Sequence, residues 1–322
     1  MKAVRVLRHG GPEVLAYEDV PTPEPGPKEA LVKIDASGVN FIDIYFREGL
    51  YKADPPFING QEGAGVVTKV GAEVEDLAEG DRVAYTGIRG SYAEYAAVPA
   101  DRLVKIPEAV TTKQAASVML QGMTVHYLTH STFPLKPGNT CLVHAAAGGV
   151  GLVLVQVAKM RGAKVIGTCS TEEKAEQVRA AGADHVILYT KQDFEAEVKR
   201  ITEGAGVDVA YDSVGKATWE GSMNCLRPRG MLVVYGNASG PVPPIDPLML
   251  AQKGSLFLTR PSLFAYIAKR KELEERAHDV LGWVAEGRVK LHIGQEYPLS
   301  EAAQAQIDLA GRKTTGKLLL IP

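Results

Sequence analysis

The stretch Ala145-Ala146-Ala147-Gly148-Gly149-Val150-Gly151 decides the fold of this chain. A short β-prone run at residues 140–144 precedes it, and residues 152–159 carry apolar side chains at helical spacing. A strand that ends in glycines and opens a helix leaves free backbone N–H groups at the positive end of the helix dipole. Such a turn binds a pyrophosphate.

The turn fits the dinucleotide-binding pattern with one departure. Read as A-x-G-x-x-G from Ala146, it has alanine where the first glycine usually stands. Gly148 would let the backbone approach the phosphates, and Gly151 would let the helix pack closely on the sheet. The motif alone is weak evidence, because glycine-rich turns are common.

The residues after the turn strengthen the evidence of the glycine motif. Strand-like and helix-like segments alternate there, as in a dinucleotide-binding domain. We expect further strands at residues 164–168, 185–189, 207–211, 231–235 and 255–259, with helices at 172–181, 194–202 and 218–226. Six strands joined by helical crossovers predict an α/β fold with a doubly wound parallel sheet, a Rossmann domain over residues 123–262.

The end of the second predicted strand indicates which cofactor binds. NAD enzymes usually place Asp or Glu there to bond the ribose 2′-hydroxyl. This chain has the hydroxyls of Ser170 and Thr171, and the cation of Lys174 one turn into the helix. That chemistry suits a 2′-phosphate and favours NADPH. Glu172 and Glu173 argue the other way, unless they are first-turn acids that complement the helix dipole.

Bulk composition is that of a soluble enzyme. The 322 residues suffice for two domains, and 36 basic against 38 acidic residues give a net charge of −2. This balance argues against nucleic acid or an anionic membrane as a partner. No apolar stretch is long enough to span a bilayer, and the first residues lack a signal-peptide core. Three scattered cysteines form no disulfide framework, so we expect a cytoplasmic protein.

The two ends of the chain have another sequence pattern than the predicted Rossmann domain. Residues 1–122 contain short β-like segments at 30–36, 65–70, 82–85 and 92–98, with little helix. Residues 264–286 read as a helix, and β-like sequence returns at 295–299 and 317–321. A tail that ends in a strand packs into an existing sheet, so we expect residues 1–122 and 263–322 to form one domain. An active site would then lie in a cleft between the domains.

Several motifs spread over the chain together resemble one family. They are 9–15 (HGGPEVL), 38–45 (GVNFIDIY), 80–83 (GDRV), 121–124 (QGMT), 144–151 (HAAAGGVG), 211–215 (YDSVG), 235–240 (YGNASG) and 259–263 (TRPSL). The chain resembles the zinc-free, zeta-crystallin-like quinone oxidoreductase branch of the medium-chain dehydrogenases/reductases. The resemblance implies a GroES-like β-rich catalytic domain beside the Rossmann domain.

The resemblance raises the question whether this chain binds zinc, because many relatives are zinc alcohol dehydrogenases. They place a cysteine after the second strand and a Gly-His-Glu further on. Here Asn40 stands for the cysteine and Gln61 for the histidine, and no cysteine precedes Cys141. We therefore expect no metal.

Hydride transfer without a Lewis acid requires an acceptor that conjugation has already activated, as in quinones and α,β-unsaturated carbonyls. The protein must orient the nicotinamide and supply an apolar slot with donors. We predict Asn40, Tyr45 and Tyr51, in one loop, as the catalytic residues. Asp43 lies beside them and could equally hold the loop by bonding backbone. No dedicated general acid is evident.

The resemblance also implies the cofactor contacts. Near the nicotinamide they are Asn40, Phe41, Ile42, Asp43, Tyr45, Thr124 and Tyr127. At the pyrophosphate they are Gly148, Gly149 and Val150. Around the adenosine phosphate they are Ser170, Thr171, Lys174, Tyr189 and Arg312, with Lys313 an equal candidate to Arg312. The remainder are Ser213, Asn237, Ala238, Ser239, Ser262, Leu263 and Phe264.

The leading hypothesis is an NADPH-dependent quinone oxidoreductase that forms a homodimer through the edge strand at residues 255–259. An NADPH-dependent 2-alkenal or enone reductase is the alternative closest in chemistry, with Tyr51 the first candidate proton donor. A non-catalytic protein that binds NADPH and RNA is the alternative of another class. The near-neutral charge argues against it.

Overall fold

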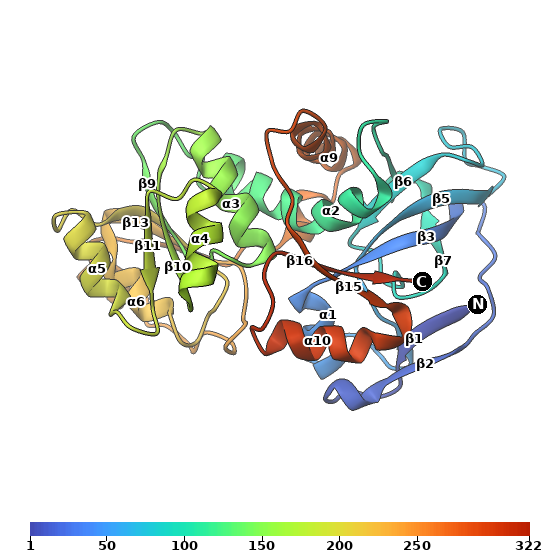
Figure 1. Ribbon diagram of the computed structural model, residues 1–322, viewed down its shortest axis with the longest axis horizontal. Helices are drawn as coiled ribbons and strands as arrows, with labels where there is room; N and C mark the ends of the chain where they lie inside the picture. Colours follow the sequence, from blue (N-terminus) through green and yellow to red (C-terminus); the bar gives the residue numbers. More distant parts are fainter. The chain divides into compact units, whose positions relative to one another are not determined.

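The computed structural model describes residues 1–322 and divides into two compact units. The first unit combines Met1–Met123 with Tyr266–Pro322, and the second is Thr124–Ala265. Both chain ends therefore belong to the first unit (Figure 1). The expected domain limits, after residues 122 and 262, stay a prediction. None of the helices has the length and apolar character needed to cross a bilayer.

The second unit contains the predicted parallel sheet. Its strands run in the order β11-β10-β9-β12-β13-β14, every pair parallel. This is the 3-2-1-4-5-6 order of a doubly wound fold, with the switch point between β9 and β12. The prediction of this fold is confirmed. The strands are β9 (Thr140–Val143), β10 (Lys164–Cys169), β11 (His185–Leu188), β12 (Val207–Asp212), β13 (Leu226–Val234) and β14 (Phe257–Thr259).

Helices cover both faces of this sheet. In Figure 1, α3 and α4 lie on one face and α5 and α6 on the other. Their bounds are α3 (Gly149–Met160), α4 (Glu172–Ala180), α5 (Phe194–Ile201) and α6 (Trp219–Asn224), and α7 (Leu248–Gln252) precedes the last strand. The core between strands and helices includes Leu142, Ile166, Ala210 and Leu232, none of them exposed. Because strands in such a sheet are buried on both faces, they read as apolar runs in the sequence.

The first unit is mostly β-structure. One sheet has the order β15-β16-β3-β5-β6-β8 with β7 paired to β3, and a smaller sheet has the order β2-β1-β4. The C-terminal strand β16 pairs antiparallel with β3, as expected of a tail that rejoins the first domain. The strands are β1 (Lys2–Val6), β2 (Leu15–Asp19), β3 (Glu29–Val39), β4 (Phe57–Ile58), β5 (Glu62–Val70), β6 (Arg82–Thr86), β7 (Tyr95–Pro99), β8 (Val104–Lys105), β15 (Ile293–Pro298) and β16 (Lys317–Ile321).

Five helices belong wholly or partly to this unit. They are α1 (Phe41–Glu48), α2 (Thr112–Tyr127), which continues into the second unit, α8 (Leu263–Tyr266), which begins there, α9 (Arg270–Ala285) and α10 (Ala302–Ala310). The expected single helix over residues 264–286 is wrong, because the chain breaks between α8 and α9. At the interruption, the Arg102 guanidinium donates to the carbonyls of Ile267 and Ala268, which are not helical there.

Candidate functional site

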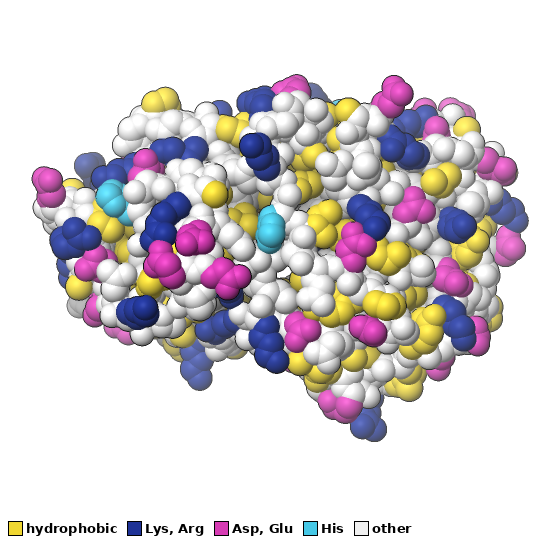
Figure 2. Space-filling model, in the orientation of Figure 1, with side chains coloured by type: hydrophobic (Ala, Val, Ile, Leu, Met, Phe, Trp, Pro, Cys, Tyr) yellow, Lys and Arg dark blue, Asp and Glu magenta, His cyan; other side chains and the backbone are white.

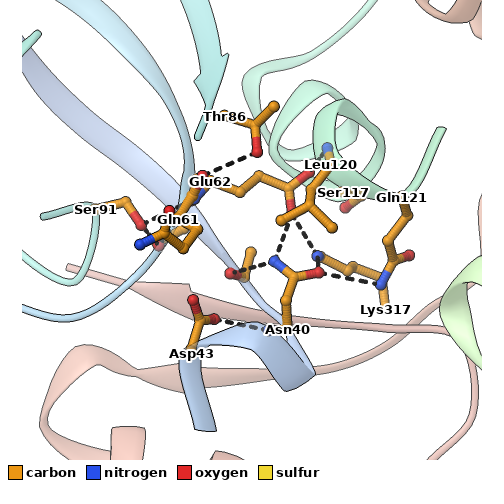
Figure 3. Close-up of polar contacts among 12 residues, drawn as sticks. Asn40, Asp43, Gln61, Glu62, Thr86, Ser91, Ser117, Leu120, Gln121 and Lys317 are labelled. Atoms are coloured by element: carbon orange, nitrogen blue, oxygen red, sulfur yellow. Dashed lines mark hydrogen bonds and ion pairs between the residues drawn. The ribbon is translucent and has the colours of Figure 1, made fainter. Parts of the chain in front are cut away.

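A cluster of buried polar side chains lies where β3, β5, α2 and β16 meet in the first unit (Figure 3). The Lys317 ammonium donates to Glu62 Oε2 at 2.5 Å and to Asn40 Oδ1 at 2.8 Å. None of the three side chains is more than slightly exposed. A charge in such surroundings must be paired and hydrogen-bonded, and here the ion pair meets that requirement.

The same cluster fixes the orientation of the Asn40 amide. Its Nδ2 donates to Glu62 Oε2 at 2.9 Å and to the Gly38 carbonyl at 3.1 Å, while its Oδ1 accepts from Lys317. Flipping the amide would turn N–H groups toward an ammonium and oxygen toward a carboxylate. With Gln121 Nε2 at 3.5 Å from Oδ1, the amide has used its hydrogen-bonding capacity within the protein. A catalytic role for Asn40 by direct contact stays a prediction.

Close packing around the cluster explains the glycine before Asn40. A Cβ on Gly38 would lie 2.2 Å from Glu62 Oε2, 2.5 Å from the Ala116 carbonyl oxygen and 2.7 Å from Lys317 Cε. The other oxygen of Glu62 accepts the Leu120 backbone N–H, inside α2, at 2.6 Å. Glu62 therefore forms hydrogen bonds with α2, with Asn40 at the end of β3 and with the C-terminal strand β16.

Asp43 is wholly buried one turn into α1. Its Oδ2 accepts the Asn40 backbone N–H at 2.8 Å and the Tyr92 hydroxyl at 2.9 Å, whereas its Oδ1 has no partner. Burial raises the pKa of Asp43 to about 7, against the opposing effect of these two hydrogen bonds. The sequence analysis left open that Asp43 holds this segment by bonding backbone. Its hydrogen bond with the Asn40 N–H is a bond of that kind.

Residues 41–48 form a helix and not the predicted loop. Asn40 is the extended N-cap, Asp43 bonds back to its N–H, and Gly49 ends the helix with a φ of 80°. The helix and the turn after it bring two predicted residues together, since the rings of Tyr45 and Tyr51 are 5.3 Å apart. Tyr45 is buried and Tyr51 half-buried. Phe41 and Ile42 are half-buried on the first turn.

The glycine turn of the second unit has the predicted geometry. Gly148 is the N-cap of α3, and Gly149 and Val150 form its first turn, with all three half-buried. The first N–H groups of a helix have no acceptor within it, so they are available to an anion. A Cβ on Gly151 would lie 2.4 Å from the Ala145 carbonyl oxygen, so no side chain fits between helix and turn. Ala145 takes the left-handed conformation, with φ 49°.

Most of the residues predicted to hold the adenosine phosphate lie at two neighbouring strand ends, and Arg312 does not. Ser170, Thr171 and Lys174 follow β10, and Tyr189 follows β11, where its N–H donates to the Cys169 carbonyl at 3.1 Å. Thr171 is the N-cap of α4 and accepts the Lys174 N–H, so its hydroxyl also has a structural task. Arg312 follows α10 in the first unit, exposed and with a φ of 56°.

The remaining predicted contacts lie in one further group and two separate places. Ser213 and the segment 237–239 meet, because the Ala238 N–H donates to Ser213 and the Ser239 hydroxyl to Val214. The others are Thr124 and Tyr127, buried on α2, and residues 262–264 at the start of α8. Residue by residue, these cofactor assignments stay predictions.

A buried chain of polar groups in the second unit was not predicted. His144 Nδ1 is 3.0 Å from Thr168 Oγ1, and its Nε2 is 3.0 Å from the Ser222 hydroxyl. Ser222 donates to Asp212 Oδ2 at 2.8 Å. Asp212 Oδ1 accepts the N–H groups of Val214 and Gly215, so the chain ends at the turn that carries Ser213.

Burial lowers the pKa of His144 and so favours the neutral imidazole. The nearby Asp212 carboxylate acts on this pKa in the opposite direction, with a smaller effect. The sequence offered one signal for this network, a histidine at the end of an otherwise apolar strand. For Glu62 the signal was the Gly-Gln-Glu segment at residues 60–62. A lysine that opens the apolar strand at residues 317–321 gave no indication that it would be buried.

Comparison with known families matches two segments of the chain. Residues 26–108 match the alcohol dehydrogenase GroES-like domain, and residues 149–281 match the family described as zinc-binding dehydrogenase. At the two positions that the resemblance assigns to zinc ligands, this chain has the amides of Asn40 and Gln61. No group of three His, Cys, Asp or Glu side chains that could hold a metal ion occurs in the structure.

Individual relatives match over essentially the whole length. A quinone oxidoreductase of Pseudomonas aeruginosa is 46% identical over 100% of this chain and 99% of its own. A 2-haloacrylate reductase of Burkholderia sp is 43% identical over 99% and 98%. The solved Escherichia coli quinone oxidoreductase complexed with NADPH has a TM-score of 0.97 and 43% identity, covering both chains completely. The chain therefore belongs to the quinone oxidoreductase branch of the medium-chain dehydrogenases/reductases.

Proposed function

We propose that this protein is an NADPH-dependent quinone oxidoreductase that transfers reducing equivalents to a quinone without a metal. The observation that carries the proposal is the turn at residues 145–151. It joins β9 to α3 at the switch point of the sheet, in a chain that quinone oxidoreductases match from end to end. NADPH supplies the hydride when bound.

The chain's own residues fit that cofactor. Half-buried N–H groups at Gly149 and Val150 face no acceptor within α3 and would hold the pyrophosphate. No carboxylate follows β10 directly. Ser170, Thr171 and Lys174 would instead hold a 2′-phosphate, since two hydroxyls and a cation suit a dianion better than a ribose hydroxyl.

Metal independence rests on the donor set around Asn40. Amide side chains replace the expected cysteine and histidine, and the Lys317 ammonium lies against both Asn40 and Glu62. A cation held in this way repels a metal ion from the same carboxylate. We propose that Asn40 keeps the start of α1 in place and that Tyr45 and Tyr51 line the slot for the acceptor. The two rings offer apolar area and one hydroxyl each.

Reduction of a conjugated carbonyl is the second candidate, and the match to a 2-haloacrylate reductase favours it. Such an acceptor needs a proton at the carbon next to the carbonyl, and Tyr51 is the first candidate to deliver it. RNA binding has less support, because acidic and basic side chains are interspersed over the face drawn in Figure 2.

We further propose that the protein is a cytoplasmic homodimer. The edge strand β14 has one side without a partner strand, and Phe257 on it is 57% exposed. An exposed apolar edge strand pairs readily with its twin across a two-fold axis. The three cysteines, all buried and free, support a reducing compartment such as the cytoplasm. Light scattering would test the dimer, and a monomer at all concentrations would contradict it.

The function is tested by following NADPH oxidation against para-benzoquinone, with 2-alkenals and 2-haloacrylate as other acceptors and NADH as the other donor. We expect turnover with quinone and NADPH. Turnover confined to the conjugated carbonyls would transfer the assignment to the second candidate. NADPH binding without turnover of any acceptor would favour the non-catalytic alternative.

Lys174 provides a test of cofactor choice. Replacing it by alanine should weaken NADPH binding by about tenfold or more, because a charge-assisted bond to the 2′-phosphate is lost, and leave NADH binding nearly unchanged. Fluorescence titration with each nucleotide measures both. An equal loss for NADH would remove Lys174 from the phosphate site.

A further inference from the structure

One arginine in the first unit is held between two aromatic rings. The Cζ atom of Arg89 lies 5.4 Å from the ring centroid of Phe46 and 5.2 Å from that of Phe57. Phe46 in turn meets Tyr51 edge to face, with ring centroids 5.7 Å apart. The cation therefore belongs to the same group of rings as Tyr45 and Tyr51.

The loop that carries Arg89 is fastened at both ends to the segment before Glu62. The N–H of Gly87 donates to the Gln61 carbonyl at 2.9 Å, and the N–H of Gly90 to the Gly60 carbonyl at 3.0 Å. Gly87 and Gly90 both have positive φ, 84° and 112°, which lets the loop turn back on that segment. Two backbone bonds and two ring contacts restrict where the guanidinium can be.

The guanidinium has no polar partner in the protein. Arg89 is exposed, makes no hydrogen bond and forms no ion pair, unlike Arg47 and Arg82, which donate to carbonyl groups. The two ring contacts engage the charge of the guanidinium and use none of its N–H groups as hydrogen-bond donors to oxygen. Those groups are arranged to bind a carboxylate or sulfonate with two parallel bonds.

We propose that Arg89 is a specificity-determining residue that binds an anionic substituent of the acceptor, while the ring or conjugated system of the acceptor packs on Phe46 and Tyr51. The substrate class is then acidic conjugated acceptors, such as quinones that carry a carboxylate or sulfonate and short conjugated acids. The proposal rests on the proposed function, because it takes Tyr45 and Tyr51 as the residues at the acceptor.

The decisive comparison uses para-naphthoquinone and its ring-sulfonated analogue as acceptors with NADPH. In the Arg89→Gln variant, kcat/KM for the sulfonated quinone should fall about tenfold or more, as for a lost charge-assisted bond, and that for the neutral quinone less than about twofold. The ratio of kcat/KM for the sulfonated quinone to that for the neutral quinone should decrease with added salt in the wild type. In the variant this ratio should not depend on salt. Arg89 is exposed, so the variant should fold normally.

The matched control is Arg229→Gln, which removes an exposed arginine of the second unit that makes no side-chain bond. It should leave the ratio between the two quinones unchanged. An equal loss for both quinones in Arg89→Gln, or an equal change in the control, would overturn the proposal.

A binding measurement separates this proposal from the function on which it rests. Naphthoate cannot accept a hydride, so calorimetry reports the subsite even for a protein that reduces no quinone. We expect the wild-type protein to bind naphthoate at least about tenfold more tightly than Arg89→Gln. Equal affinity would overturn the subsite. Failure of all quinone turnover together with a clear difference in naphthoate affinity would overturn the function alone.

Discussion

Each unit buries one polar network, and the two networks handle charge differently. In the first unit, Lys317 and Glu62 bring a full positive and a full negative charge into the interior, with Asn40 between them. In the second unit, the Asp212 carboxylate is the one formal charge in a chain of hydroxyls and an imidazole, and backbone N–H groups solvate it.

The difference has a physical consequence. A buried ion pair depends on both partners, because the loss of one leaves an uncompensated charge. The second network keeps its one charge solvated by backbone N–H groups, so a substitution of a neutral member removes only one or two hydrogen bonds. The first network should therefore tolerate single substitutions far worse than the second, although the two are equally buried.

The largest effect should follow from Lys317→Met. It leaves the Glu62 carboxylate buried without its cation and should reduce the free energy of unfolding by about 3–5 kcal/mol. Urea denaturation measures this. The double variant Glu62→Gln with Lys317→Met should recover a large part of the loss, since no charge remains.

An exposed ion pair of the same unit is the control. Lys113 and Glu296 are 2.6 Å apart with side chains 45% and 41% exposed, and Lys113→Met should cost less than about 1 kcal/mol. A loss in Lys317→Met as small as in this control would contradict the account of the first network.

A smaller effect is expected from Ser222→Ala in the second unit. It removes the hydroxyl between His144 and Asp212, so the free energy of unfolding should fall by about 1–3 kcal/mol. Urea denaturation of Ser222→Ala against Ser262→Ala, at an exposed serine, measures it. A loss as large as that of Lys317→Met would remove the distinction between the two networks.

A further effect concerns the pH dependence of stability. Burial lowers the pKa of His144 below 6.5, so its unfolded form binds more protons and stability decreases as pH falls below 6.5. Burial raises the pKa of Asp43 from 3.8 to about 7, so its folded form binds more protons and stability decreases as pH rises through that range. Below pH 6.5 the two contributions oppose each other.

Each of the two pH-dependent contributions can be isolated by one substitution. The Asp43→Asn variant should gain stability relative to the wild type as pH rises from 3.8 to about 7, and His144→Gln should gain as pH falls below 6.5. Thermal or urea unfolding across that range measures both. Parallel pH profiles for wild type and variants would contradict these assignments.

The sequence predicted the second unit better than the first. Apolar strands alternate there with helices, and the turn at 145–151 marks the switch point, so strand order followed from general rules. The helix α1 was missed although its capping residues, Asn40, Asp43 and Gly49, stand in the sequence, because the segment was interpreted as a substrate loop.

Other features depend on contacts between distant residues. The helix is interrupted after α8 where Arg102, far away in the chain, binds two carbonyls. Lys317 and Glu62 are 255 positions apart, and Lys317 opens an apolar strand, so periodicity carries no trace of their pairing. Local pattern predicts local structure, and such pairs become evident only in the fold.

The central claim is NADPH-dependent quinone reduction without a metal, and the most direct test measures it on protein treated with a chelator. Metal content and the rate of quinone reduction would be determined on the same sample, before treatment and after it. The account predicts an unchanged rate in protein freed of zinc. Loss of the rate on chelation, with recovery on addition of zinc, would contradict it.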